Sequence, residues 1–100
     1  MNTSDSRPRS DELYRAILTL ETLEECKKFF NDLCSVAELQ AMEHRFGVAV
    51  RLDKGMIYND ILEETGASSA TISRVNRTLR YGEGGLRIAF DRMKGAEEEA

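Results

Sequence analysis

The stretch that decides the fold runs from Gly66 to Gly82 and reads GASSATISRVNRTLRYG. It contains three arginines and no acidic residue, within a chain whose formal net charge is −4. Ile72, Val75 and Leu79 recur at helical spacing, which predicts an amphipathic helix with one apolar face. A functional interpretation therefore has to explain a basic helix in an acidic chain.

The residues before this stretch complete a helix-turn-helix outline. The segment MIYNDILEET places Ile57 and Ile61 four residues apart, and Gly66 then interrupts the helical pattern. Ser68 or Ser69 can cap the helix that follows. An ordinary hairpin of two helices packed into a bundle has the same glycine and the same apolar spacing. Spacing alone leaves both interpretations open.

The position of the arginines favours DNA binding. A turn of about 100° per residue puts Ala70, Arg74 and Arg77 on the face opposite the apolar one. A recognition helix in a major groove needs short side chains at its start and arginines that meet phosphates or guanine. A solvated face that happens to carry arginines is the alternative. The residues predicted to contact DNA are Ser68, Ser69, Ala70, Thr71, Ser73, Arg74, Arg77 and Arg80.

The rest of the chain also has helical patterns. One amphipathic helix is predicted near residues 10–20, and capping boxes at Thr22/Glu25 and Ser35/Glu38 open two more. The last of these three continues until Gly55, a left-handed stop. No alternating pattern supports a strand. A chain of 100 residues with 41% hydrophobic content suits one compact domain, so the predicted fold class is all-α.

Several functional classes lack support in the sequence. No apolar run reaches membrane-spanning length and no signal-peptide pattern occurs, which predicts a cytoplasmic protein. Cys26 and Cys34 lack metal-ligand or redox spacing and are interpreted as reduced core thiols. His44 is the only histidine, Glu63 and Glu64 diverge around a helix, and no phosphate loop or nucleophile motif is found. We therefore expect no enzyme activity, no metal site and no cofactor.

Two segments resemble a known family. The sequence TGASSATISRVNRTLRYGEGGLRIAF, together with the preceding EHRFGVAVRLDKG, is similar to the Trp-repressor superfamily, most closely to its YerC/YecD-type branch. The resemblance implies a six-helix subunit that intertwines with a second copy as a homodimer. It also implies that Ile57–Thr65 and Ser69–Tyr81 are the DNA-reading helices, which places the helix-turn-helix at about residues 57–81. The predicted parts are a flexible arm over 1–9, the helical DNA-binding domain over 10–94 and an acidic disordered tail over 95–100.

The resemblance also raises the question of a small-molecule effector. In the Trp repressor the bound amino acid lies between two arginines, and the matching residues are Arg45 and Arg74. Hydroxyls near the charged groups of the ligand are matched by Ser35 and Thr78. Val75 stands where the Trp repressor has a glycine beside the indole ring, and a β-branched side chain would occupy that space. The implied effector is therefore small and amino-acid-like but not tryptophan. Alternatively, the two arginines bind phosphate or pair with acidic residues.

These observations predict a sequence-specific DNA-binding transcriptional regulator that acts as a homodimer on a double-stranded DNA operator. A repressor is expected, because the chain has no second domain that could recruit polymerase. The alternative is a helical dimeric protein-interaction module whose helix-turn-helix docks a protein in place of DNA. Neither interpretation includes a membrane.

Overall fold

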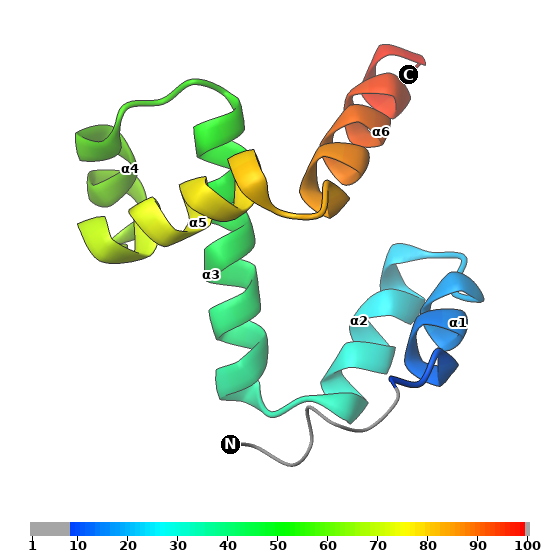
Figure 1. Cartoon of the computed structure of the whole chain (residues 1–100). Coiled ribbons are helices and arrows are strands. Elements are labelled where there is room, and N and C mark those ends of the chain that lie inside the picture. The colour runs from blue at the N-terminus through cyan, green and yellow to red at the C-terminus, as the bar shows by residue number, and fades with distance from the viewer. Residues whose placement is uncertain (1–8, 100) are drawn as a thin grey trace. The chain divides into compact units, whose positions relative to one another are not determined.

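The computed structural model describes residues 9–99, which form six α-helices (Figure 1). The helices are α1 (Glu12–Leu18), α2 (Leu23–Leu33), α3 (Val36–Asp53), α4 (Tyr58–Thr65), α5 (Ser69–Tyr81) and α6 (Gly85–Glu99). No strand occurs over residues 9–99, which confirms the all-α prediction. None of these helices has the length and apolar character needed to cross a membrane.

The sequence predicted a flexible arm and a disordered tail at the two ends of the chain. Residues 1–8 of the expected arm, and residue 100 of the expected tail, lie outside the described residues. α6 extends to Glu99, through most of the segment that the sequence assigned to the tail. The helix thus continues through Lys94 and Gly95 into the glutamates.

Both predicted capping boxes are present. At the start of α2, the backbone N–H of Glu25 donates to the Thr22 hydroxyl over 3.1 Å. The Glu25 carboxylate in turn accepts from the N–H of Glu21 over 2.9 Å. At the start of α3, Ser35 and Glu38 exchange hydrogen bonds of 2.8 Å and 3.1 Å. Because these bonds satisfy N–H groups that have no partner inside the helix, they fix where α2 and α3 begin.

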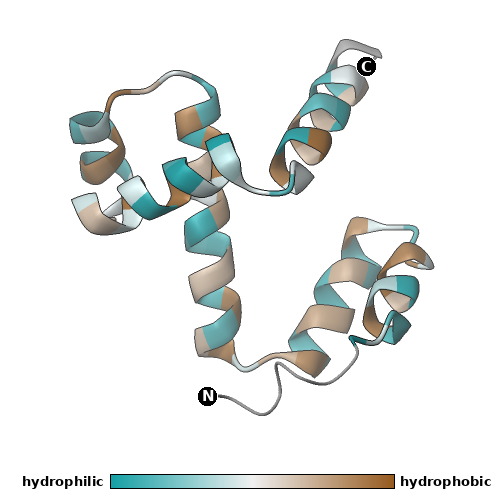
Figure 2. Ribbon diagram, viewed as in Figure 1, coloured by the Kyte–Doolittle hydropathy of each residue, from teal (hydrophilic) through white to brown (hydrophobic). Residues whose placement is uncertain are grey.

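The chain divides into two compact units, with the boundary between Leu39 and Gln40. The first unit contains α1, α2 and the first turn of α3. Neither α1 nor α2 has a buried residue, and Leu18 and Leu23 are 84% and 72% exposed. Both helices consequently show apolar, brown positions along their surfaces in Figure 2. The first unit of the single chain has apolar surface without a buried core.

The core lies in the second unit, between α3, α4, α5 and α6. Val48 of α3, Ile61 of α4 and Ile72 of α5 each have 0% exposure. Burying an aliphatic side chain contributes about 1.5–3 kcal/mol, so this trio holds the helix-turn-helix against α3. The other buried residues are Ala49, Ala67, Val75 and Phe90, with Leu79 and Leu86 packed against them half-buried.

Two glycines end helices as the sequence predicted. Gly55 follows α3 with φ of +85°, and Gly66 caps α4 with φ of +74°. A side chain in this left-handed region costs about 1–2 kcal/mol, which glycine avoids. The N–H of Gly66 donates to the Leu62 carbonyl over 2.9 Å and closes the last turn of α4. The chain can then start α5 only two residues later, after Ala67 and Ser68.

The helix implied over Ile57–Thr65 starts one residue later in the structure, and Ile57 does not join Ile61 in the core. Ile57 is 63% exposed and precedes the helix as its N-cap residue, with extended backbone angles. α4 begins at Tyr58, so Ile57 lies outside the helical periodicity that puts Ile61 in the core. The spacing of four was present, but only one member of the pair is inside the helix.

Candidate nucleic-acid interface and ligand pocket

The helix-turn-helix consists of α4 and α5, which pack against each other across the Gly66 turn. Ser68 is the N-cap of α5, and its hydroxyl accepts from the N–H of Thr71 over 3.1 Å. Ile72 and Val75 are buried on the inner face of α5, at 0% and 8% exposure. The inner face is thereby fixed, and the opposite face of α5 has to lie on the surface.

The outer face of α5 carries most of the residues predicted to contact DNA. Ser69, Ala70, Ser73, Arg74, Arg77 and Arg80 are all exposed. Four of them surround a hollow of about 260 Å³, namely Ala70, Ser73, Arg74 and Arg77. Small side chains toward the start of the helix leave room for a close approach, and the arginines follow along the same side.

The charge of this face is uncompensated within the described structure. Among the side chains described over residues 9–97, those of Arg74 and Arg77 form no ion pair with an acidic residue. Arg80 differs, because its Nε donates to the Asn76 side-chain oxygen over 3.3 Å on the same helix. Two guanidinium groups are therefore available to an anion, and the third is held along the helix.

Ser68 and Thr71 form a second hydrogen bond besides that of the N-cap. The Ser68 hydroxyl donates to the Thr71 hydroxyl over 3.1 Å, and Thr71 is half-buried. Both hydroxyls thus already serve the first turn of α5. The structure places them at the start of the outer face, where their local role is to define the beginning of the helix.

α3 contacts the helix-turn-helix through the side chains of Arg51 and His44. Arg51 donates through Nε to the Glu64 carboxylate over 3.0 Å and through its terminal nitrogen to the Gly47 carbonyl over 3.0 Å. His44 lies with Nε2 at 3.2 Å from the Thr65 carbonyl, and since a carbonyl only accepts, this nitrogen carries the proton. These contacts hold the C-terminal end of α4 on α3 and give His44 a packing role.

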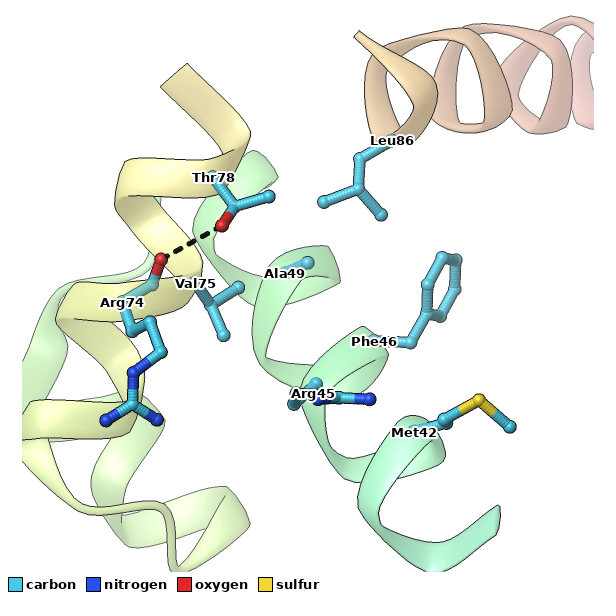
Figure 3. Close-up of a pocket in the computed structure, with 8 residues that line it drawn as sticks. All are labelled: Met42, Arg45, Phe46, Ala49, Arg74, Val75, Thr78 and Leu86. Carbon is cyan, nitrogen blue, oxygen red and sulfur yellow. Dashed lines mark hydrogen bonds between the residues drawn. The ribbon is translucent and has the colours of Figure 1, made fainter. Parts of the chain in front are cut away.

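A pocket of about 410 Å³ opens between α3, α5 and α6 (Figure 3). α5 contributes Arg74, Val75 and Thr78, and α3 contributes Arg45 among others. Four of the five residues predicted for an effector site therefore line one pocket. Its full lining is Met42, Arg45, Phe46, Ala49, Arg74, Val75, Thr78 and Leu86.

The polar groups of the pocket are few. Thr78 donates its hydroxyl proton to the Arg74 carbonyl over 3.3 Å, the dashed line in Figure 3. Its oxygen can still accept, because a hydroxyl has one donor and two lone pairs. Neither Arg45 nor Arg74 forms an ion pair in the part of the chain that the structure describes. The Val75 side chain extends from α5 toward Ala49 of α3, within the pocket (Figure 3).

Ser35, the fifth predicted residue, does not line this pocket. It belongs to the first unit, where it is the capping partner of Glu38. Hydrogen bonding by the Ser35 backbone, and secondarily by its side chain, lowers the pKa of the Glu38 carboxyl. In this chain the Ser35 hydroxyl accepts from a helix N–H and has a structural role.

Sequence reasoning did not identify the apolar wall of the pocket. Met42, Phe46 and Ala49 follow one another at intervals of four and three, so they share one face of α3. That spacing predicts a helix but does not mark a pocket. Leu86 reaches the pocket from α6, and no local pattern shows which part of an apolar stripe a later helix will leave uncovered. No cluster of residues suited to hold a metal ion occurs over the described range.

The chain is similar to known proteins over most of its length. Residues 9–94 match the family described as Trp repressor protein. The chain is 49% identical over 90 residues to the uncharacterized protein YerC of Bacillus subtilis, covering 90% of this chain and 86% of that protein. A crystal structure of a "putative Trp repressor" from Staphylococcus aureus is 46% identical, with a TM-score of 0.81 over 94% of this chain and 95% of that one.

A second crystal structure, of a TrpR-like protein from Eubacterium eligens, is also 46% identical. Its TM-score is 0.79, over 84% of this chain and 87% of that one. The helix order, the helix-turn-helix between α4 and α5 and the family match agree along nearly the whole described chain. The chain therefore belongs to the Trp repressor family.

Proposed function

We propose that this protein is a sequence-specific DNA-binding transcriptional regulator that acts as a homodimer in the cytoplasm. The observation that carries the proposal is the outer face of α5, where Arg74 and Arg77 are exposed and without acidic partners over the described range. Membership of the Trp repressor family supports it. The acidic net charge does not oppose it, because DNA responds to the field within about 10 Å of a surface at moderate salt.

The residues along α5 have different proposed roles in DNA binding. Ala70 and Ser73 are short enough for the backbone to approach base edges, and Arg74 and Arg77 reach phosphates or guanine. Ser68, Ser69 and Thr71 stand at the positively polarised start of α5, where backbone N–H groups favour a phosphate. Arg80 follows the face toward its C-terminal end. Residues 10–94 would then be the functional domain.

The proposed dimer rests on the apolar surface of the first unit. α1 and α2 contain no buried residue in the single chain, although both carry large apolar side chains. A contiguous apolar surface is normally covered in a stable protein, and a second copy is the simplest cover. We propose a two-fold dimer with intertwined subunits that presents two copies of α5 to one side. In this proposal the dimer represses by occupying its operator.

The pocket between α3, α5 and α6 is the proposed effector site. A ligand carboxylate would bind Arg45 and Arg74, and the Thr78 oxygen would accept from an ammonium group. The volume of about 410 Å³ does not itself exclude an indole ring. We propose that the Val75 methyl groups nevertheless block the place that an indole ring would take beside α5. The proposed effector is therefore an amino-acid-like molecule with a side chain smaller than that of tryptophan.

Fluorescence anisotropy with labelled duplex DNA at graded salt tests the function. The unmodified protein should bind random duplexes with an affinity that falls steeply with salt, and genomic fragments selected by it more tightly. Ala70→Glu should abolish both by clash and repulsion, whereas Ala96→Glu, at an exposed site on α6, should not. Absence of salt-dependent binding by the unmodified protein would favour the protein-interaction module instead.

A further inference from the structure

Asp53, the last residue of α3, carries a nearly buried carboxylate. Its side chain is 9% exposed, accepts a hydrogen bond from Arg87 of α6 and forms an ion pair with Lys94 of the same helix. Arg87 lies at 2.6 Å from one carboxylate oxygen and Lys94 at 3.1 Å from the other. The two cations are seven residues apart, so they lie on one side of α6. One carboxylate at the end of α3 therefore binds two successive turns of α6.

The chain itself does little to orient α6. Gly82 and Gly84 lie between it and α5, Gly85 is its first residue, and Gly84 has φ of +88°. The apolar anchor of α6 is Phe90, which is 4% exposed and whose ring centroid lies 5.4 Å from that of Phe46. Phe90 and the half-buried Leu86 are four residues apart, so the apolar contact of α6 covers a short stretch of its N-terminal half.

The ion pairs extend the contact between α6 and α3 beyond this stretch. Arg87 precedes Phe90 by three residues and Lys94 follows it by four. The two ion pairs with Asp53 therefore come from positions before and after Phe90 along α6. Leu86, next to Arg87, is the contribution of α6 to the pocket, and Phe46 lines the same pocket. A change in the angle of α6 would thus displace one wall of the pocket.

We propose that Asp53 is a positioning residue: by holding Arg87 and Lys94 it sets the orientation of α6 and with it the Leu86 wall of the pocket. The part concerning α6 stands on the contacts alone. The part concerning the pocket rests on the proposed effector function.

The chain offers a matched control at Asp91. Its carboxylate also approaches Arg87, over 3.5 Å, but within α6 itself and 62% exposed. Asp91→Asn removes the same charge from the same arginine without touching the link to α3. Asp53→Asn removes the link. The two variants separate a loss of charge around Arg87 from a loss of orientation.

The direct test is a distance measurement between spin labels in the full chain. Cys26 and Cys34 are free and are replaced by Ser, and labels are attached at Glu63→Cys on α4 and Arg92→Cys on α6, both exposed sites. Dilution with unlabelled chain isolates the distance within one subunit. Asp53→Asn should broaden or shift the distance distribution, Asp91→Asn should leave it unchanged, and Asp53→Glu should largely restore it.

A general loss of stability is separated from a loss of orientation by Ile61→Val, which weakens the core away from α6. If Ile61→Val broadens the distribution as much as Asp53→Asn does, Asp53 has no positioning role. An unchanged distribution in a folded Asp53→Asn protein would overturn the proposal equally.

Calorimetry with L-valine and L-leucine tests the connection to the pocket. If the unmodified protein binds either one, Asp53→Asn should weaken that binding by about tenfold and Asp91→Asn should not. Equal affinities in the two variants would contradict the pocket part of the proposal. If the unmodified protein binds neither, the proposed effector class is wrong, while the spin-label distances still decide whether Asp53 orients α6.

Discussion

Arg77 is the residue on which the DNA-binding proposal can be tested most simply. It is exposed on α5, lines the hollow with Ala70 and Ser73, and has no acidic partner among the side chains described over residues 9–97. Arg77→Ala should weaken binding to selected and random DNA alike, and lower the salt slope by about one unit if it meets a phosphate. Anisotropy titrations at several salt concentrations measure both quantities. Arg92→Ala, on α6, is the control, and an equal effect there would indicate nonspecific charge loss.

Val75 makes a prediction about ligand choice. Val75→Gly should open the pocket beside Ala49 and permit weak tryptophan binding, whereas the unmodified protein should bind no tryptophan. The same change should lower the free energy of unfolding by about 1 kcal/mol or more, since it puts glycine within α5 and removes packed methyl groups. Calorimetric titration and thermal denaturation check the two effects. Tight tryptophan binding by the unmodified protein would contradict the blocked-site interpretation.

Asp53 makes a prediction about pH. The hydrogen bond from Arg87, with a smaller contribution from Lys94, lowers the pKa of the Asp53 carboxyl below its ordinary value. Arg87 and Lys94 face it from α6, and Asp91 reaches the same arginine. A carboxyl with a lowered folded-state pKa stabilises the protein above its unfolded value, near 4, and loses this as pH falls through the folded value. The unfolding free energy should therefore fall less between pH 5 and pH 2–3 in Asp53→Asn than in the unmodified protein. Denaturant titrations across this range measure the difference, and parallel curves would contradict it.

At the scale of the helix, the start of α5 depends on one hydroxyl. Ser68 accepts from the Thr71 N–H, while Ser69, one residue later, forms no comparable bond in the described structure. Ser68→Ala should destabilise the protein by about 1 kcal/mol, the usual value of a lost N-cap, and Ser69→Ala by much less. Thermal denaturation of the two variants provides the comparison. Similar losses would mean that the cap does not determine where α5 begins.

The helices show what a sequence can and cannot reveal. The family resemblance implied a helix over Ser69–Tyr81, which is where α5 lies. The residues alone indicated a helix with a regular apolar face, because capping and periodicity act within a few residues, but they left Ser68 and Ser69 as alternative caps. The contacts of Asp53 with Arg87 and Lys94 were not predicted, since they join residues 34 and 41 positions apart in sequence. The family resemblance named the arginines of the pocket, Arg45 and Arg74. It did not identify Leu86, which reaches the pocket from a helix later in the chain. Local chemistry marks helix ends, but only the packed chain shows which faces meet.

At the scale of the whole molecule, the proposed dimer predicts specific consequences of surface charge. Leu18→Arg and Leu23→Arg, on the exposed apolar surface of α1 and α2, should shift the protein toward monomer. Leu62→Arg, on α4 and 43% exposed, should leave the dimer intact. Sedimentation velocity at micromolar concentration checks both. A monomeric unmodified protein would contradict the dimer and, with it, an operator of two half-sites about 34 Å apart.

The absence of buried residues from α1 and α2 has a consequence for how the regulator responds to its own abundance. If a second copy covers these helices, their share of the folding free energy exists only after two chains meet, so the competent fraction rises with the concentration of the chain. A gene for such a protein is then sensitive to its own expression level even without an effector. When cell growth dilutes the protein, its dimers would dissociate and leave the operator free. Continued synthesis would restore the dimer and the occupancy of the operator.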